Sequence, residues 1–164
     1  MVRAGAADPG ARGTDLVGAV KETNPKDAVA SDKVPVGLCP DTLIVAVAMA
    51  FVEGGLKYGK GNFKVAGAKA SVYLDALDRH AKAYRNGEDI DPDSGLPHLW
   101  KAAACISILI DCIEIGNLVD DRPPSSPVAE MMRRLSPKVK ALVEKFGDRK
   151  PRHYTITDTP GRDF

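Results

Sequence analysis

Hydrophobic residues recur at helical spacing through the middle of the chain, and no segment shows the strict alternation that is typical of a half-buried strand. Residues 43–52 read LIVAVAMAFV. Such a uniformly apolar run predicts a helix that is buried on most of its sides, with Asp41 or Thr42 as its cap. We expect this segment to be the central helix of the core.

The same periodicity predicts two more helices. The first covers about residues 68–85, where Tyr73 and Leu77 mark an apolar face and acidic and basic pairs occupy the other. The next begins near Pro97, which suits a first helical turn, and ends at Gly116, a favourable stop. A short polar connection joins these two helices.

Prolines divide the C-terminal part of the chain. Pro123 and Pro124 break the helical pattern that follows the third helix. Shorter helices are then predicted over residues 128–134 and 137–146, with Ser136 as the cap of the second.

These elements predict an all-α fold, a four- to five-helix bundle in a single domain. The Gly- and Ala-rich residues 1–23 have no usable period and are expected to form a disordered arm. Residues 24–148 hold the helical domain, and residues 149–164 are predicted to form an extended tail. At 164 residues, the chain is too short for two substantial cores.

The charge balance argues against two classes of partner. The chain has 23 basic and 22 acidic residues and a net charge of +1, which does not favour a nucleic-acid-binding or membrane-surface protein.

No window is long and apolar enough for a membrane span, and no signal peptide is visible. The three cysteines are typical of free thiols in a reducing cytosol. We therefore expect a cytoplasmic protein, in the host cytosol if a phage encodes it.

Polar residues gather in the stretch from Gly54 to His98. They combine groups that bind phosphate with groups that bind metals: Lys57, Tyr58, Asn62, Arg79, His80, Glu88, Asp91, Ser94 and His98. Carboxylates in the connection between the second and third helices suit Mg²⁺ or Mn²⁺, which prefer oxygen ligands and bind substrate phosphates. A solvated acidic loop is the simpler alternative interpretation.

A second set of acids lies on the predicted helices. Paired carboxylates stand on adjacent turns: Asp75 with Asp78, and Asp111 with Glu114. Facing helices can build metal sites in this way, although exposed ion pairs would explain the same residues. At 100° per residue, Asp111 lies roughly 140° around its helix from His98, so both cannot point into one narrow site unless the loop folds over. At least one of the two sets is therefore not catalytic.

Several blocks of sequence resemble one family in their order along the chain. They are NPKDA at 24–28, KVP at 33–35, LKYGKGNF at 56–63, DRH at 78–80, NGEDIDPDSGLPH at 86–98 and RHYTI at 152–156. Over these blocks the chain is similar to bacteriophage proteins described as dATP/dGTP diphosphohydrolase N-terminal-domain proteins. Those proteins are associated with MazG-like, all-helical nucleotide pyrophosphohydrolases.

The resemblance implies a metal-dependent hydrolase that converts a purine deoxynucleoside triphosphate, dATP or dGTP, to monophosphate and pyrophosphate. The catalytic residues that it implies are His80, His98 and Glu88. Carboxylates would hold Mg²⁺ or Mn²⁺, which lowers the pKa of the attacking water: Glu53, Glu88, Asp91 and Asp111. The substrate would be bound by cationic, aromatic and polar side chains: Lys57, Tyr58, Asn62, Phe63, Arg79 and Ser94.

Two other hypotheses stay open. The Glu-Glu-x-x-Glu motif of MazG-like enzymes is absent from the chain, which favours a non-catalytic nucleotide-binding protein that sequesters a nucleotide or a nucleotide-derived defence signal. A structural or host-interaction bundle is the third hypothesis. Bundles with one thoroughly apolar helix commonly self-associate, so a homo-oligomer is also expected.

Overall fold

The computed structural model describes residue 26 and residues 33–161. The arm predicted at residues 1–23 lies outside these described residues. The chain divides into two units, Met1–Cys39 and Pro40–Phe164. In the first unit, a short 3₁₀ helix, η1, covers Val36–Leu38.

Helices dominate the second unit, which confirms the predicted all-α class. They are α2 (Asp41–Tyr58), α3 (Asn62–Ala66), α4 (Ala70–Arg85), α5 (His98–Glu114) and α6 (Val128–Phe146), followed by the 3₁₀ helices η2 (Gly147–Arg149) and η3 (Ile156–Asp158). Two short strands, β1 (Ala68–Lys69) and β2 (Leu118–Val119), pair in parallel with Ala68 opposite Leu118. This pairing displaces the start of α4 from the predicted residue 68 to Ala70.

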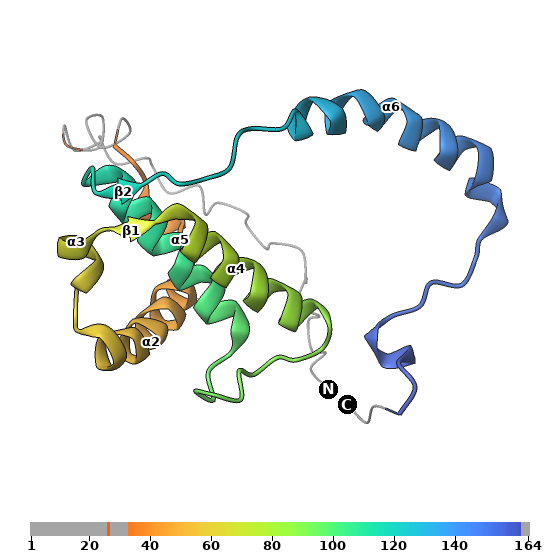
Figure 1. Cartoon of the computed structure of the whole chain (residues 1–164). Coiled ribbons are helices and arrows are strands. Elements are labelled where there is room, and N and C mark those ends of the chain that lie inside the picture. The colour runs from red at the N-terminus through yellow and green to blue at the C-terminus, as the bar shows by residue number, and fades with distance from the viewer. Residues whose placement is uncertain (1–25, 27–32, 162–164) are drawn as a thin grey trace, which may run out of the picture. The chain divides into compact units, whose positions relative to one another are not determined.

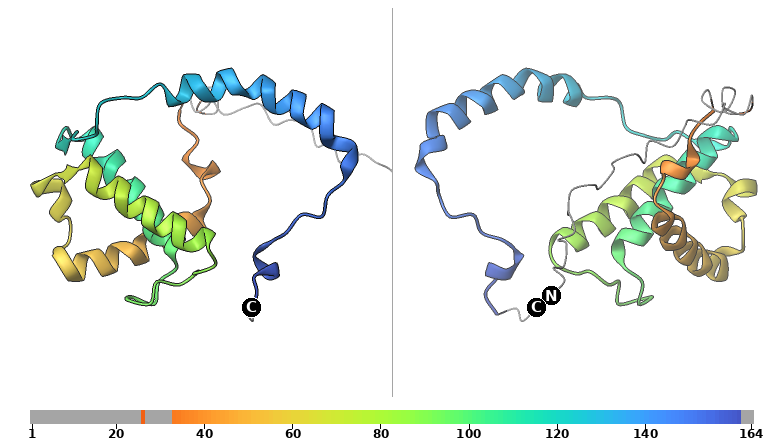
Figure 2. Two further views of the ribbon diagram at one scale, coloured as in Figure 1. Left: turned by 45° about the vertical axis from the view of Figure 1, so that its right-hand side comes forward. Right: turned by 180° about the vertical axis from the view of Figure 1, so that it is seen from behind.

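Helix α5 is the centre of the helical packing, because it contacts both α2 and α4. Figures 1 and 2 show α4 and α5 side by side, with α2 crossing α5. The expectation that residues 43–52 form the buried central helix is wrong. In α2 only Ala50 is buried, whereas a row of apolar side chains is exposed: Leu43, Ile44, Val45, Met49 and Val52.

The small core lies where α3 and the strands meet α5. Phe63, Ala68 and Cys112 are buried there and pack against Phe51 and Ile108 among others. The ring centroids of Phe51 and Phe63 are 5.7 Å apart. Aromatic packing therefore joins α2 to α3.

Asn117 fixes the end of α3 against the end of α5. Its side-chain amide donates to the carbonyl oxygens of Phe63, at 3.1 Å, and Lys64, at 3.0 Å. Gly67 follows with φ of +74°, and a Cβ at this position would lie 2.5 Å from the carbonyl oxygen of Asn117. The close approach of these two backbone segments therefore requires glycine.

The C-terminal helices differ from the prediction. One continuous helix, α6, runs through Pro137 where two shorter helices were expected. Ser136 does not cap a helix, because its hydroxyl donates to the carbonyl oxygen of Met132 at 3.0 Å within α6. In the predicted extended tail, residues 151–155 are irregular, and η3 follows with a capping box between Thr155 and Asp158. None of the helices in the described part of the chain has the length and apolar character of a membrane span.

Candidate functional site

A cavity of about 550 Å³ opens among α2, α4 and α5. It is lined by six residues of the sequence-predicted site: Glu53, Lys57, Tyr58, Asn62, Arg79 and His80. Lys101 and apolar residues, including Val72 and Ile108, complete the lining. The structure therefore brings most of the predicted phosphate-binding side chains to one place.

Lys101 is the residue of this site that sequence reasoning missed. Its ammonium group donates to Glu53 Oε1 at 3.1 Å, to Ser94 Oγ at 3.2 Å and to Asp91 Oδ2. Burial disfavours the charge, but the two carboxylates outweigh burial and raise the pKa of Lys101 above its usual value. Lys101 lies three residues after His98, so both side chains lie on one face of α5. This spacing is the sequence signal that could have identified Lys101 as a residue of the site.

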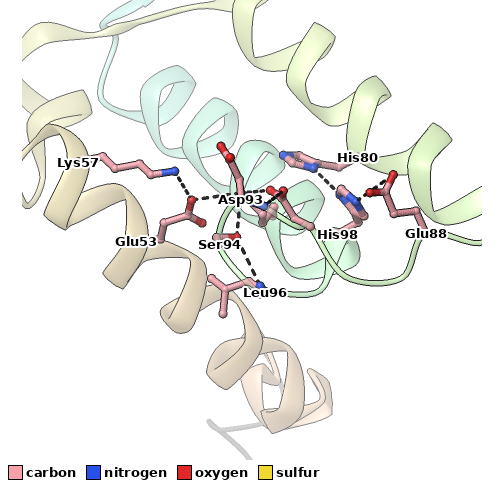
Figure 3. A network of polar contacts seen from close by, with 10 residues as sticks. Glu53, Lys57, His80, Glu88, Asp93, Ser94, Leu96 and His98 are labelled. Carbon is pink, nitrogen blue, oxygen red and sulfur yellow. Dashed lines mark hydrogen bonds and ion pairs between the residues drawn. The ribbon is translucent and has the colours of Figure 1, made fainter.

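Glu53 lies between two ammonium groups. Lys57, one turn further along α2, is 2.5 Å from the Glu53 carboxylate that also binds Lys101. Burial opposes ionisation of Glu53, but the hydrogen bonds from these lysines prevail and hold its pKa below the ordinary value. Figure 3 shows the side chains of Glu53 and Lys57 extending from α2.

The connection between α4 and α5 is folded tightly by its own backbone. The amide of Asp91 donates to the carbonyl oxygen of Leu96 at 2.9 Å, and the amide of His98 donates to that of Asp89 at 2.9 Å. These bonds place Asp91 beside the first turn of α5. Its bond from Lys101, together with the backbone amide of Asp93, lowers the pKa of the Asp91 carboxyl despite its burial. The loop is thus ordered by backbone hydrogen bonds, with Asp91 buried, whereas Glu88, Asp89 and Asp93 are exposed, as the solvated-loop interpretation expected.

His80 of α4 and His98 of α5 meet next to Asp91. The two Nδ1 atoms are 2.8 Å apart, and one ligand atom from each of the three residues lies within 4.8 Å of the others. Burial, followed by the nearby Lys101 charge, lowers the pKa of His80, so this imidazole is neutral at neutral pH. In Figure 3, Glu88 approaches the far side of His98, with Oε2 3.9 Å from Nε2. The ligand atoms of His80, Asp91 and His98 are close enough together to hold a divalent metal ion.

The remaining predicted residues lie apart from this cluster. Asp111 accepts hydrogen bonds of 2.8 and 2.9 Å from Lys64. This agrees with the prediction that Asp111 and His98 point to different sides of their helix, α5. Phe63 is 8% exposed and belongs to the core. Asp78 forms an exposed ion pair with Lys82 at 3.4 Å. This agrees with the interpretation of the acids on the helices as members of exposed ion pairs.

A model of the protein family described as "dATP/dGTP diphosphohydrolase, N-terminal" matches residues 23–122. The match includes every residue that lines the cavity. The chain belongs to this family. Helix α6 and the tail lie beyond the matched residues of the dATP/dGTP diphosphohydrolase N-terminal family.

The chain is also similar to a phage protein. A protein of Salmonella phage PMBT28 named "dATP/dGTP diphosphohydrolase" is 30% identical over 96 residues, which are 58% of this chain and 32% of that protein. The chain therefore spans about a third of the length of the curated relative that it matches. No solved structure matches the chain. The comparisons support a hydrolase function at the level of the family.

Proposed function

We propose that the chain hydrolyses a purine deoxynucleoside triphosphate, dATP or dGTP, to the monophosphate and pyrophosphate. The observation that carries this proposal is the concentration of Lys57, Arg79 and Lys101 around one cavity of about 550 Å³ in a member of this family. Arg79 offers a cation for phosphate oxygens, and Lys57 and Lys101, whose charges are balanced by Glu53 and Asp91, offer further N–H donors beside it. The apolar part of the lining suits a purine base.

Arg79 would make the first contact with the phosphates. It lines the cavity and forms no ion pair with any residue that the structure describes. A guanidinium group binds two phosphate oxygens at once, so Arg79 offers both charge and orientation. Lys57 and Lys101 are held by Glu53 and would supply further N–H donors from fixed positions. Tyr58 would stack on the base.

His80 would act on the attacking water. Its imidazole lines the cavity, and its lowered pKa keeps a nitrogen lone pair free at neutral pH. Water attacks the α-phosphorus, the bond from this phosphorus to the bridging oxygen breaks, and pyrophosphate leaves. His80 accepts the proton of the water, while Arg79 and the N–H donors of Lys57 and Lys101 stabilise the charge that develops on the phosphates.

A Mg²⁺ site built from Glu53, Glu88, Asp91 and Asp111 does not fit the observed arrangement. Glu53 and Asp91 meet at the ammonium group of Lys101, and Asp111 pairs with Lys64 elsewhere. The four carboxylates thus do not converge on one point. In this proposal Mg²⁺ or Mn²⁺ arrives with the triphosphate as part of the substrate, and no step relies on a cation held by those four residues.

Product analysis tests the proposal. Purified protein is incubated with each dNTP and Mg²⁺ or Mn²⁺, nucleotides are separated by chromatography and pyrophosphate is assayed independently. We expect dAMP or dGMP with equimolar pyrophosphate, a raised KM in Arg79→Ala and a kcat lowered by about 100-fold or more in His80→Ala. Lys82→Ala, on the exposed part of α4, is the matched control. Absence of turnover with every dNTP would contradict the proposal.

A nucleotide-sequestering protein is the second candidate. The observation that favours it is the ammonium group of Lys101, which lies between Glu53 and Asp91. In many hydrolases a catalytic metal ion is bound between two such carboxylates. Equilibrium dialysis separates the two functions, because a sequestering protein retains unhydrolysed nucleotide. In that case Arg79→Ala would weaken retention, and His80→Ala would not change any product yield.

A further inference from the structure

We infer that His80, Asp91 and His98 form a resident site for a divalent first-row transition-metal ion, and that this site discriminates against Mg²⁺. The three side chains come from α4, the connecting loop and α5, and their ligand atoms lie within 4.8 Å of one another. Two imidazole nitrogens and one carboxylate oxygen suit Mn²⁺, Co²⁺ or Zn²⁺, whereas Mg²⁺ prefers oxygen ligands alone. The inference does not require the chain to hydrolyse nucleotides.

The surroundings of His98 indicate which nitrogen would bind the metal. His98 is 6% exposed, and its Nε2 atom is buried without a hydrogen-bond partner among the described residues. The Glu88 carboxylate, 3.9 Å away, favours a proton on this nitrogen. The lone pair of His98 then lies on Nδ1, which faces His80. A carboxylate behind a ligating histidine is a common second-shell arrangement in metal sites.

Only a small movement of the two imidazole rings is needed for both Nδ1 atoms to bind one metal ion. If His98 carries its proton on Nε2, the 2.8 Å contact between the two Nδ1 atoms requires His80 Nδ1 to donate to the lone pair on His98 Nδ1. Transfer of that proton from Nδ1 to Nε2 of His80 through solvent exposes two facing lone pairs without a change in net charge. With metal–nitrogen bonds of about 2.05 Å in tetrahedral geometry, the two nitrogens need to be about 3.3 Å apart. The rings would therefore separate by roughly half an ångström.

Asp91 can join this site without leaving Lys101 unpaired. The ammonium group of Lys101 binds Glu53 at 3.1 Å as well as Asp91, so one carboxylate remains with it when the other turns to a metal. Asp91 is 9% exposed, and the backbone bonds of its loop hold it beside His98. The fold therefore holds the backbone of the third ligand beside the two histidines, and its carboxylate turns from Lys101 to bind the metal.

Cobalt binding tests the inference on the full-length, tag-free chain. Co²⁺ titration is followed by visible d–d absorption and by calorimetry, with Mg²⁺ in millimolar excess as the competitor. We expect one Co²⁺ per chain that Mg²⁺ does not displace. His80→Ala and Asp91→Asn should each weaken binding by more than about 100-fold, and Glu88→Gln by about 10-fold. Circular dichroism checks that each variant is folded.

The matched control is the third histidine of the chain. His153 lies exposed outside the helical unit's core, so His153→Ala should bind Co²⁺ as the parent chain does. Absence of Co²⁺ binding, displacement by Mg²⁺, or unchanged binding in folded His80→Ala would overturn the inference. Nucleotide turnover is measured separately, with Mg²⁺ and without Co²⁺, because His80 cannot accept a proton while its Nδ1 atom ligates Co²⁺ and its Nε2 atom is protonated. Under these conditions, Co²⁺ binding without Mg²⁺-supported turnover would contradict only the proposed hydrolase, and turnover without Co²⁺ binding would contradict only this metal site.

Discussion

Lys101 is the residue whose loss should disturb the polar interior most. It is shared by Glu53 and Asp91, whose side chains are 15% and 13% exposed. Lys101→Met would leave both carboxylates without their common cation, and we expect the free energy of unfolding to fall by about 3 kcal/mol. Urea denaturation measures the change.

Lys82→Met is the matched control for this substitution. Lys82 pairs with Asp78 on the surface, and both side chains are 69% exposed. Its removal should change stability by less than about 0.5 kcal/mol. Equal effects of the two lysine substitutions would contradict the role of Lys101.

Glu53 should make the stability of the chain depend on pH in the acidic range. Its pKa in the folded chain is below the ordinary value of 4.5, so its stabilising contribution is present above that value and is lost as the pH falls through the lowered folded pKa. Glu53→Gln should therefore flatten the pH dependence of unfolding below about pH 4.5. Thermal melts across pH 3 to 7 check this, and a slope as steep as in the parent chain would argue against it.

At the scale of elements, the contact between Gly67 and Asn117 joins α3 to β2. Gly67 has φ of +74° and ψ of −179°, a region that is almost exclusive to glycine. Gly67→Ala would also place a Cβ 2.5 Å from a backbone oxygen. We expect a loss of about 3 kcal/mol in unfolding free energy, measured by chemical denaturation.

Gly147 offers a comparison for Gly67. It has φ of −60°, and a Cβ there would meet nothing within 4 Å. Gly147→Ala should change stability by less than about 0.5 kcal/mol. A tolerated Gly67→Ala would show that the backbone at α3 can move apart from β2.

Helix boundaries could be predicted where the local signals were strong. Pro97 and Gly116 bracket α5 closely, because caps and stops act within one turn. The same reasoning failed at α6, since Pro137 removes only its own amide donor from a helix that continues around it. It also missed β1 and β2, since two-residue strands have no period to detect.

At the scale of the whole molecule, the outer face of α2 is an apolar surface without a partner in the described residues. Ile44 and Val45 are 61% and 63% exposed, and Ile44 also lines a groove of about 380 Å³ that Phe51 and Ser107 border. Contiguous exposed apolar surface of this kind is typical of interfaces. We propose that a second copy of the chain covers this face.

Light scattering coupled to size-exclusion chromatography tests the oligomer. The parent chain should elute as a dimer or a larger assembly at micromolar concentration, and Ile44→Glu should shift it to the monomer because a charge cannot be buried unpaired. Lys82→Glu, on exposed α4, should leave the assembly intact. A monomeric parent chain would rule out this interface.

The sequence by itself determined the all-α class, the positions of α2, α4 and α5, and the polar residues that line the cavity other than Lys101. These follow from periodicity and caps, which act over a few residues. Only the tertiary structure decided which charges meet. Glu53 and Lys101 are 48 positions apart, and Lys64 and Asp111 are 47 apart. Such pairings depend on how the helices cross and how the loop before α5 closes, and no local pattern encodes either.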